Sequence, residues 1–179
     1  MKARIREYQR SDRVAFVKLM EQLMDYVVSI DDLKITRRMP EFGKSYTQRT
    51  LQKVAENNGI IYVAELDAEL VGVVVGIFPE QTKEDQLEHV PSKRGEVLEL
   101  VVKTGYRGRG VGTMLMNRLE EYFKENNCDM SGVGVLFPNK NAHRLYNKLG
   151  YEDRSIYMAK DLSRQKLVMR KSRARRARA

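Results

Sequence analysis

Apolar positions along the first half of the chain predict two helices followed by a β-hairpin. Residues 2–8 alternate as a strand does, and a stripe of apolar side chains then recurs at helical spacing over about residues 12–28. A second helix is predicted over about residues 45–58. The β-rich runs 60–66 and 70–78 flank a tight turn, which is the pattern of a hairpin.

The second half of the chain continues the alternation of strands and helices after a long polar loop over residues 79–94. Loops of this length in a small domain are often functional. The loop shows no helical or strand pattern of its own. The pattern after it predicts a strand, a helix, a strand, a short helix and a last strand, over about residues 96–102, 111–126, 129–137, 142–149 and 151–160.

A Gly/Arg-rich segment, Gly105 to Gly112, joins a predicted strand to a predicted helix. The first N–H groups of a helix lack intrahelical partners and carry the positive end of the dipole, so they favour a phosphate group. Glycines let a ligand approach the backbone, and Arg107 and Arg109 add positive charge. An isolated Gly-x-Gly before a helix is as often a simple tight turn. The P-loop and three-glycine dinucleotide patterns are missing, which disfavours nucleotide hydrolysis and dinucleotide binding.

Composition suits one soluble α/β domain of 179 residues. The single cysteine, Cys128, excludes an internal disulfide, and no paired Cys or His spacing suggests a metal site. The first ten residues are polar, and the longest apolar run, 70–78, is too short to span a bilayer. We therefore expect a cytoplasmic protein without membrane contact.

The positive charge of the chain is concentrated at its end. The sequence has 33 basic and 24 acidic residues, and eight of the basic ones lie in residues 164–179, which leaves 25 against 24 elsewhere. This distribution weakens any inference from net charge to a nucleic-acid-binding fold. We divide the chain into a domain over 1–160 and a basic tail over 161–179, which is expected to be flexible.

Two motifs resemble the GNAT N-acetyltransferase superfamily. Arg107-x-x-Gly110-x-Gly112 is similar to the family's [QR]-x-x-G-x-[GA] loop. A second segment is similar to the family's N-x-x-A-x-x-L-Y-x-x-x-G-[FY] pattern, and here it reads Asn139-x-x-Ala142-x-x-Leu145-Tyr146-x-x-Leu149-Gly150-Tyr151. The resemblance covers roughly residues 5–160 as a fold. It implies an α/β fold with a mixed central sheet of about six strands, a splayed parallel pair within it, and helices on both faces.

The resemblance also implies acetyl-CoA as co-substrate and direct transfer of its acetyl group to an amine. Backbone groups of the strand and the Gly/Arg loop are expected to hold the pantetheine arm and the pyrophosphate. The implied cofactor-binding residues are Leu100, Val101, Val102, Arg107, Gly108, Arg109, Gly110, Val111, Gly112, Thr113, Asn139 and Tyr146. The alternative for Asn139 or Asn141 is a plain helix cap.

The implied catalytic residues are Tyr146, Glu96 and Glu99. Tyr146 matches the family tyrosine that protonates the CoA sulfur, and core packing is the alternative. Either glutamate suits the base, directly or through water, and a solvated or salt-bridged strand residue is the alternative for each. Because the two are an odd number apart, strand alternation predicts that they project from opposite faces, and Glu96 is ranked slightly first.

The acceptor is predicted to be a small-molecule or protein amine, with Tyr26, Asp31 and Asp32 as substrate-binding residues. Acidic side chains gather in the segments that vary in the family, which favours a cationic amine; charged loops kept for solubility are the alternative. These segments carry Asp25, Tyr26, Asp31, Asp32, Tyr46, Glu84, Asp85 and Glu88. Two other functions stay open: an acyl-CoA-binding module without turnover, and a nucleic-acid- or ribosome-associated protein that binds through its tail. A homodimer is also left open.

Overall fold

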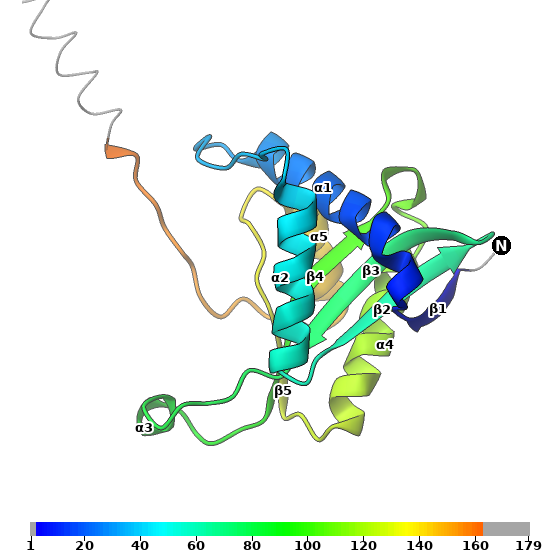
Figure 1. Cartoon of the computed structure of the whole chain (residues 1–179). Helices are drawn as coiled ribbons and strands as arrows, with labels where there is room; N and C mark the ends of the chain where they lie inside the picture. The colour runs from blue at the N-terminus through cyan, green and yellow to red at the C-terminus, as the bar shows by residue number, and fades with distance from the viewer. Residues whose placement is uncertain (1–2, 163–179) are drawn as a thin grey trace, which may run out of the picture.

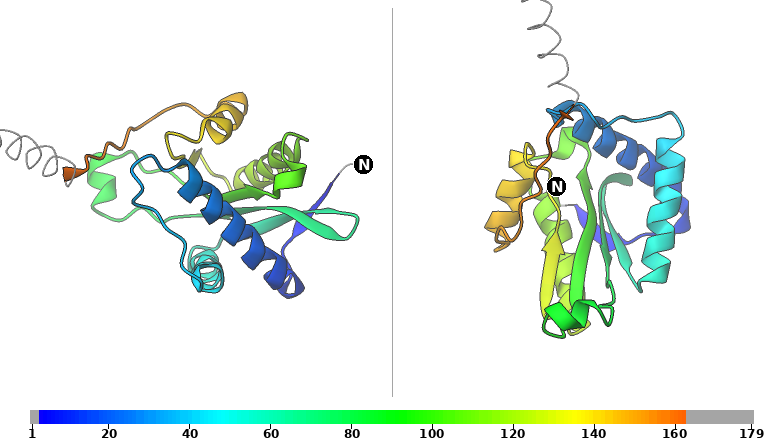
Figure 2. Two further views of the ribbon diagram at one scale, coloured as in Figure 1. Left: turned by 90° about the horizontal axis from the view of Figure 1, so that it is seen from above. Right: turned by 90° about the vertical axis from the view of Figure 1, so that its left-hand side faces the viewer.

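A five-stranded mixed sheet lies between two layers of helices in the computed structural model, which describes residues 3–162 (Figures 1 and 2). The strand order is β1-β2-β3-β4-β5; strands β1 to β4 pair antiparallel with one another, and β5 pairs parallel with β4. The strands are β1 (Arg4–Glu7), β2 (Ile60–Leu66), β3 (Glu69–Ile77), β4 (Arg94–Val102) and β5 (Met130–Val133). This arrangement confirms the predicted α/β architecture with its parallel pair.

The helices divide between the two faces of the sheet. Helices α1 and α2 cover one face, and α4 covers the other with α5 beside it (Figure 2). Short helix α3 lies within the long loop after β3, which the sequence predicted to have no regular structure. The helices are α1 (Arg13–Ile30), α2 (Phe42–Glu56), α3 (Asp85–Glu88), α4 (Val111–Glu125) and α5 (Lys140–Lys148), with 3-10 turns η1 (Arg10–Asp12) and η2 (Thr104–Tyr106).

The last predicted strand is wrong, since residues 151–160 form no strand in the structure. Tyr151 is anchored, because its hydroxyl lies 2.8 Å from Ser131 Oγ and its ring packs against that of Tyr146. The residues after it leave the sheet, and the side chains of Ile156 and Tyr157 are 83% and 93% exposed. An alternating apolar pattern makes a strand only where one face is buried, and here neither face is covered.

Strand β4 contains a bulge that changes which side chains share a face. Val75 of β3 pairs with Glu99, whereas the next residue, Gly76, pairs with Val97, so Leu98 is the extra residue. A bulge reverses the alternation of side chains beyond it. Val97 consequently packs with the α4 layer, while Leu98 and Val101 pack with the α1 layer.

Two glycines allow α4 to approach the sheet closely. A Cβ atom at Gly95 would lie 2.6 Å from the ring of Phe123, and one at Gly76 would lie 2.4 Å from Leu119 Cδ1. Leu115, Leu119 and Phe123 are buried in this contact. The packing fixes the position of α4, and therefore the point at which its N-terminus meets the end of β4.

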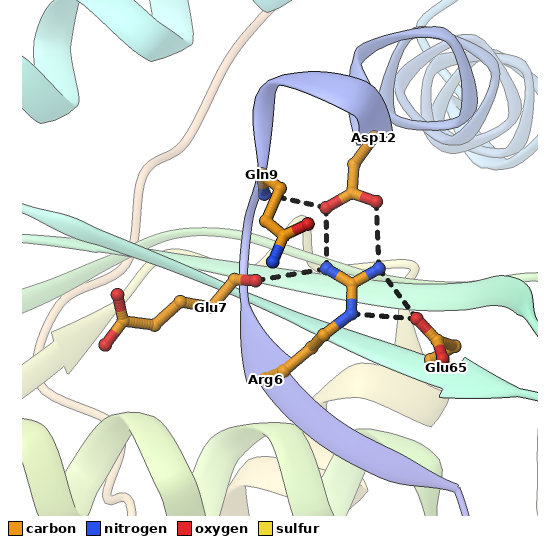
Figure 3. Close-up of polar contacts among 5 residues, drawn as sticks. All are labelled: Arg6, Glu7, Gln9, Asp12 and Glu65. Carbon is orange, nitrogen blue, oxygen red and sulfur yellow. Dashed lines mark hydrogen bonds and ion pairs between the residues drawn. The ribbon is translucent and has the colours of Figure 1, made fainter.

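An arginine cluster fixes the start of α1 on the opposite face (Figure 3). The Arg6 guanidinium donates to both Asp12 carboxylate oxygens at 2.7 and 2.9 Å, and its Nε donates to Glu65 at 2.8 Å. Arg6 and the hydrogen bond from Gln9 N–H hold the pKa of Asp12 below its usual range, although burial opposes this effect. The cluster joins β1, β2 and η1, and so sets the direction in which α1 crosses the sheet.

Most of the predicted basic tail lies outside the described residues, since the structure describes the chain only to residue 162. The predictions about the tail, nucleic acid included, stay predictions. Among residues 3–162, no helix combines the length and the apolar character needed to cross a membrane.

Candidate active site

The Gly/Arg-rich segment forms a loop that leads directly into the N-terminus of α4. Gly108 and Gly110 have positive φ angles of 73° and 81°, and Gly110 occupies the N-cap position. A Cβ atom at either glycine would meet nothing within 4 Å, so this stretch of backbone is open to a ligand. The first N–H groups of a helix have no intrahelical acceptors, which makes those of Val111, Gly112 and Thr113 available. This geometry fits the phosphate groups of a coenzyme.

Two arginines of this loop are exposed and rest on tyrosine rings. The guanidinium of Arg107 lies 4.9 Å from the ring centre of Tyr26, and its Nε donates to the Val102 carbonyl at 3.0 Å. The guanidinium of Arg109 lies 5.7 Å from the ring centre of Tyr106. Contacts of this kind orient a cation without neutralising it, so both arginines keep their charge for an anionic ligand.

Asn139 and Tyr26 connect the loop to the start of α5. Asn139 is the N-cap of α5, where its Oδ1 accepts from the Ala142 N–H at 3.2 Å. The same oxygen accepts from the Tyr26 hydroxyl, also at 3.2 Å. The helix-cap alternative therefore describes Asn139 in this structure. Tyr26, predicted to bind the acceptor, lies between Arg107 and Asn139 and so belongs to the same cluster as the loop.

Beyond their paired ends, β4 and β5 separate and a cavity of about 330 Å³ opens between them. The two strands pair only from Arg94–Val97 to Met130–Val133. Residues 98–100 and 134–136 then line the cavity from either side, and side chains of α1 and α2 line the rest of it on their face of the sheet. Leu100 lines this space, whereas the side chain of Val101 is buried in the α1-side core and only its backbone is available.

Glu99 is a buried carboxylate in the wall of this cavity. It is 9% exposed, and its Oε1 accepts a hydrogen bond from the hydroxyl of Tyr46 on α2. Burial raises the pKa of Glu99, while the Tyr46 hydrogen bond and the nearby Lys53 and Arg49 act in the opposite direction. A buried carboxylate with a raised pKa inside a cavity is well suited to accept a proton.

Tyr146 lines the same cavity from α5. Its side chain is buried among the residues of the α4-side core, so its ring does pack in the core, as the alternative to a catalytic role expected. Burial, together with the negative charge of Glu99, raises the pKa of Tyr146 to about 12. The phenol therefore keeps its proton throughout the neutral range and is able to donate it.

Glu96 and Glu99 lie on the same face of β4, so the prediction that they project from opposite faces is wrong. The bulge at Leu98 adds one residue between them and cancels the alternation. Gly95 and Val97 face the α4 layer, which places Glu96 on the other side with Glu99. Glu96 is exposed and lines a neighbouring cavity, which Tyr146 also lines, whereas Glu99 is buried in the wall of this one.

The acidic residues predicted to attract a cationic acceptor lie outside the cavity wall. Asp31 is 6% exposed, and its carboxylate accepts from the N–H groups of Leu33, Ile35 and Thr36 at 2.8 to 3.0 Å. It organises the loop between α1 and α2. Asp32 is exposed and does not line the cavity.

Sequence reasoning missed much of the wall that α1 and α2 supply. Tyr46 was noted only as a residue of a variable segment, because its partner Glu99 lies 53 positions away in the sequence. Phe42 stacks on Tyr46 with ring centres 4.7 Å apart, and Met24 lies on the apolar stripe of α1. The only available signal was the i, i+4 spacing of the two aromatic residues.

Comparison with known proteins places this arrangement in a family. Residues 18–151 match the acetyltransferase (GNAT) family, and the chain belongs to it. An uncharacterized N-acetyltransferase of Methanocaldococcus jannaschii is 34% identical over 96 residues, which are 53% of this chain and 54% of that relative. The match thus spans about half the length of this relative.

Solved structures show the same fold. A tetramutant of a Bacillus halodurans protein superposes with a TM-score of 0.75 at 21% identity, covering 89% of this chain and 99% of that one. A predicted acetyltransferase of Clostridium acetobutylicum, solved with acetyl-CoA, superposes with a TM-score of 0.66 at 19% identity, covering 90% and 97%. At these identities the likeness concerns the fold alone.

Proposed function

We propose that this protein is an acetyl-CoA-dependent N-acetyltransferase, with Glu99 as the general base and Tyr146 as the general acid. One observation carries the proposal: a buried carboxylate and a buried phenol line one cavity, which opens where β4 and β5 separate. Family membership and the acetyl-CoA bound to the Clostridium acetobutylicum neighbour support the choice of co-substrate.

The loop and strand residues divide the work of binding. The N–H groups at the start of α4, with Arg107 and Arg109 beside them, hold the pyrophosphate. The backbone of β4 beyond Val97 is free of β5 and available to the pantetheine arm. Acetyl-CoA supplies the acetyl group as an activated thioester.

Glu99 and Tyr146 supply the two proton transfers. The Glu99 carboxylate takes a proton from the attacking amine, directly or through a water molecule, and Tyr146 gives its phenolic proton to the departing sulfur. The amide N–C bond forms while the C–S bond breaks, so the products are an acetamide and free coenzyme A. Exchange with solvent then removes the proton from Glu99 and restores that of Tyr146.

We rank Glu99 above Glu96, which reverses the order expected from the sequence. Glu96 is exposed and lies outside the wall of this cavity, whereas Glu99 is buried in it. Burial raises the pKa of Glu99, which makes its carboxylate a better base near neutral pH.

Two measurements on the full chain test the function. Calorimetric titration with acetyl-CoA should give saturable binding, and a panel of primary amines should release free thiol only when acetyl-CoA and an amine are both present. Mass spectrometry should find the acetyl group on the amine. Binding without turnover by any amine would favour the acyl-CoA-binding alternative and contradict the proposal.

A further inference from the structure

We infer that the acceptor is a primary amine on an apolar body, with the reacting amino group as its only cation. This inference rests on the proposed function and names the substrate class of the same cavity. It narrows the cationic amine that the acidic loops suggested, because it excludes any positive charge beyond the reacting amino group. Three features of the described residues carry it: the apolar wall, the single carboxylate, and the cations around that carboxylate.

The acceptor side of the cavity is almost wholly hydrocarbon. Met20, Leu23, Met24 and Val27 come from α1, and Phe42 comes from α2. Among the residues lining the cavity, all within the described part of the chain, Glu99 alone carries a formal charge. A ligand that fills this space exchanges water for methyl, thioether and aromatic groups, so an apolar body binds there and a second ammonium group loses its hydration without compensation.

Three of the carboxylates in the segments that vary in the family have other partners. Asp31 binds backbone N–H groups of its own loop. Asp25 forms an ion pair with Arg38 at 2.5 Å. Asp85 accepts from the Thr82 N–H in the loop that carries α3, away from the cavity. These three side chains therefore stabilise loops and are engaged away from the cavity.

The charges near the base are positive. The guanidinium of Arg49 lies 5.0 Å from the ring centre of Tyr46, whose hydroxyl binds Glu99, and Arg49 and Lys53 are both close enough to lower the pKa of that carboxylate. A diamine that placed one nitrogen at Glu99 would bring its second cation into this environment. Repulsion then adds to the cost of desolvation.

The apolar wall also helps the chemistry that Glu99 performs. An alkylamine is almost wholly protonated at neutral pH, because its pKa lies near that of lysine, about 10.4. Transfer into a low-dielectric cavity lowers the pKa of the amine and raises that of the carboxylate. The ammonium group therefore gives its first proton to solvent more easily, and the neutral amine that results attacks the thioester and passes its second proton to Glu99.

A matched pair of amines tests this inference. Hexylamine and hexamethylenediamine share a six-carbon chain and differ only in the distal ammonium group. With saturating acetyl-CoA and thiol release as the readout, kcat/KM for hexylamine should exceed that for the diamine by about tenfold or more. Butylamine should fall below hexylamine, because it covers less of the apolar wall.

A pair of variants on one helix links the selectivity to the wall. Met24→Asp places a carboxylate in the cavity and should lower the hexylamine preference at least about fivefold. Val14→Asp is the control, because Val14 is also on α1 but is 70% exposed and outside the cavity, and it should leave the ratio unchanged. Titration with acetyl-CoA confirms that each variant is folded.

The outcomes separate this inference from the proposed function. Acetylation of both amines with equal or greater efficiency for the diamine would overturn the inference and leave the enzyme assignment intact. So would an unchanged ratio in a Met24→Asp variant that still binds acetyl-CoA. Absence of turnover with every amine would overturn both.

Discussion

The two sides of the candidate site are built on different principles. One side, the cofactor wall, consists of the end of β4 and the start of α5, which line the cavity, and of the loop 103–110 and the start of α4, which lie outside its lining. It presents backbone groups beside the exposed Arg107 and Arg109. The acceptor wall consists of the inward faces of α1 and α2, and it presents side chains, nearly all apolar. Under the proposed function, backbone groups bind the coenzyme, whereas side chains select the amine. Changes in the first wall should therefore alter coenzyme affinity, and changes in the second should alter amine preference.

The largest effect should come from the one carboxylate in the cavity. Glu99→Gln keeps the shape of the side chain and an oxygen for the Tyr46 hydroxyl, but it removes the base. We expect kcat/KM for the amine to fall about 10³-fold, within the range of general-base catalysis. Acetyl-CoA affinity, measured by titration, should be almost unchanged.

The pH profile sharpens this prediction. Glu99 acts only when deprotonated, so the rate should rise with pH through its pKa. Because burial raises this pKa, the rise should occur at a higher pH than for an ordinary glutamate. The Glu99→Gln variant should lack this rise. Glu96→Gln is the matched control on the same face of β4, and its profile should resemble that of the wild type. A large loss in the control with normal turnover in the Glu99 variant would reverse the assignment.

Tyr146→Phe should produce the second largest effect, about a 10²-fold decrease in kcat. The substitution keeps the buried ring and its packing against Tyr151 but removes the proton donor. Because the pKa of Tyr146 is raised to about 12, the wild-type rate should show no loss of this acid below pH 10. A more acidic thiol in the leaving group would need less protonation, so an acetyl thioester of thiophenol should react with both forms at similar rates. An equal defect with that thioester would indicate a packing role.

The same division explains what was predictable from the sequence. The cofactor wall depends on residues close together in the chain, and glycines with positive φ leave a readable pattern at Gly108 and Gly110. The hydrogen bond between Tyr46 and Glu99 joins α2 to β4, which are far apart in the sequence, and no local sequence pattern predicts it. Helix and strand positions were predictable because each buries a periodic apolar face.

Two errors had local physical causes. Side-chain alternation along a regular strand predicted Glu96 and Glu99 on opposite faces. The bulge at Leu98 inserts one residue between them, so this prediction failed. Asp31 looked available because its charge is visible in the sequence, whereas the backbone N–H groups that donate hydrogen bonds to it are not. Counting acidic residues therefore misjudged the polarity of the acceptor wall.

Gly110→Ala should have a smaller effect, confined to the cofactor wall. A side chain at φ 81° costs roughly 1–2 kcal/mol. We expect the loop of the variant to relieve this strain by leaving the conformation that binds phosphate. Coenzyme binding must then restore the strained conformation. We expect the dissociation constant for acetyl-CoA to rise roughly 5- to 30-fold, with no change in the preference between amines. Gly105→Ala is the control: a Cβ there also meets nothing within 4 Å, but its φ is not positive, so affinity should be maintained.

The smallest effect concerns Tyr26, whose contacts lie with the cofactor wall although α1 carries it. Tyr26→Phe removes the hydrogen bond to Asn139 but keeps the ring beneath Arg107. A hydrogen bond of this kind contributes about 0.5–1.5 kcal/mol, so acetyl-CoA affinity should fall roughly 2- to 10-fold. Tyr26→Leu also removes the ring contact and should cost about 0.5–1 kcal/mol more. If both variants instead raised KM for the amine and left coenzyme affinity unchanged, Tyr26 would belong to the acceptor wall, and the boundary between the two walls would move to Arg107.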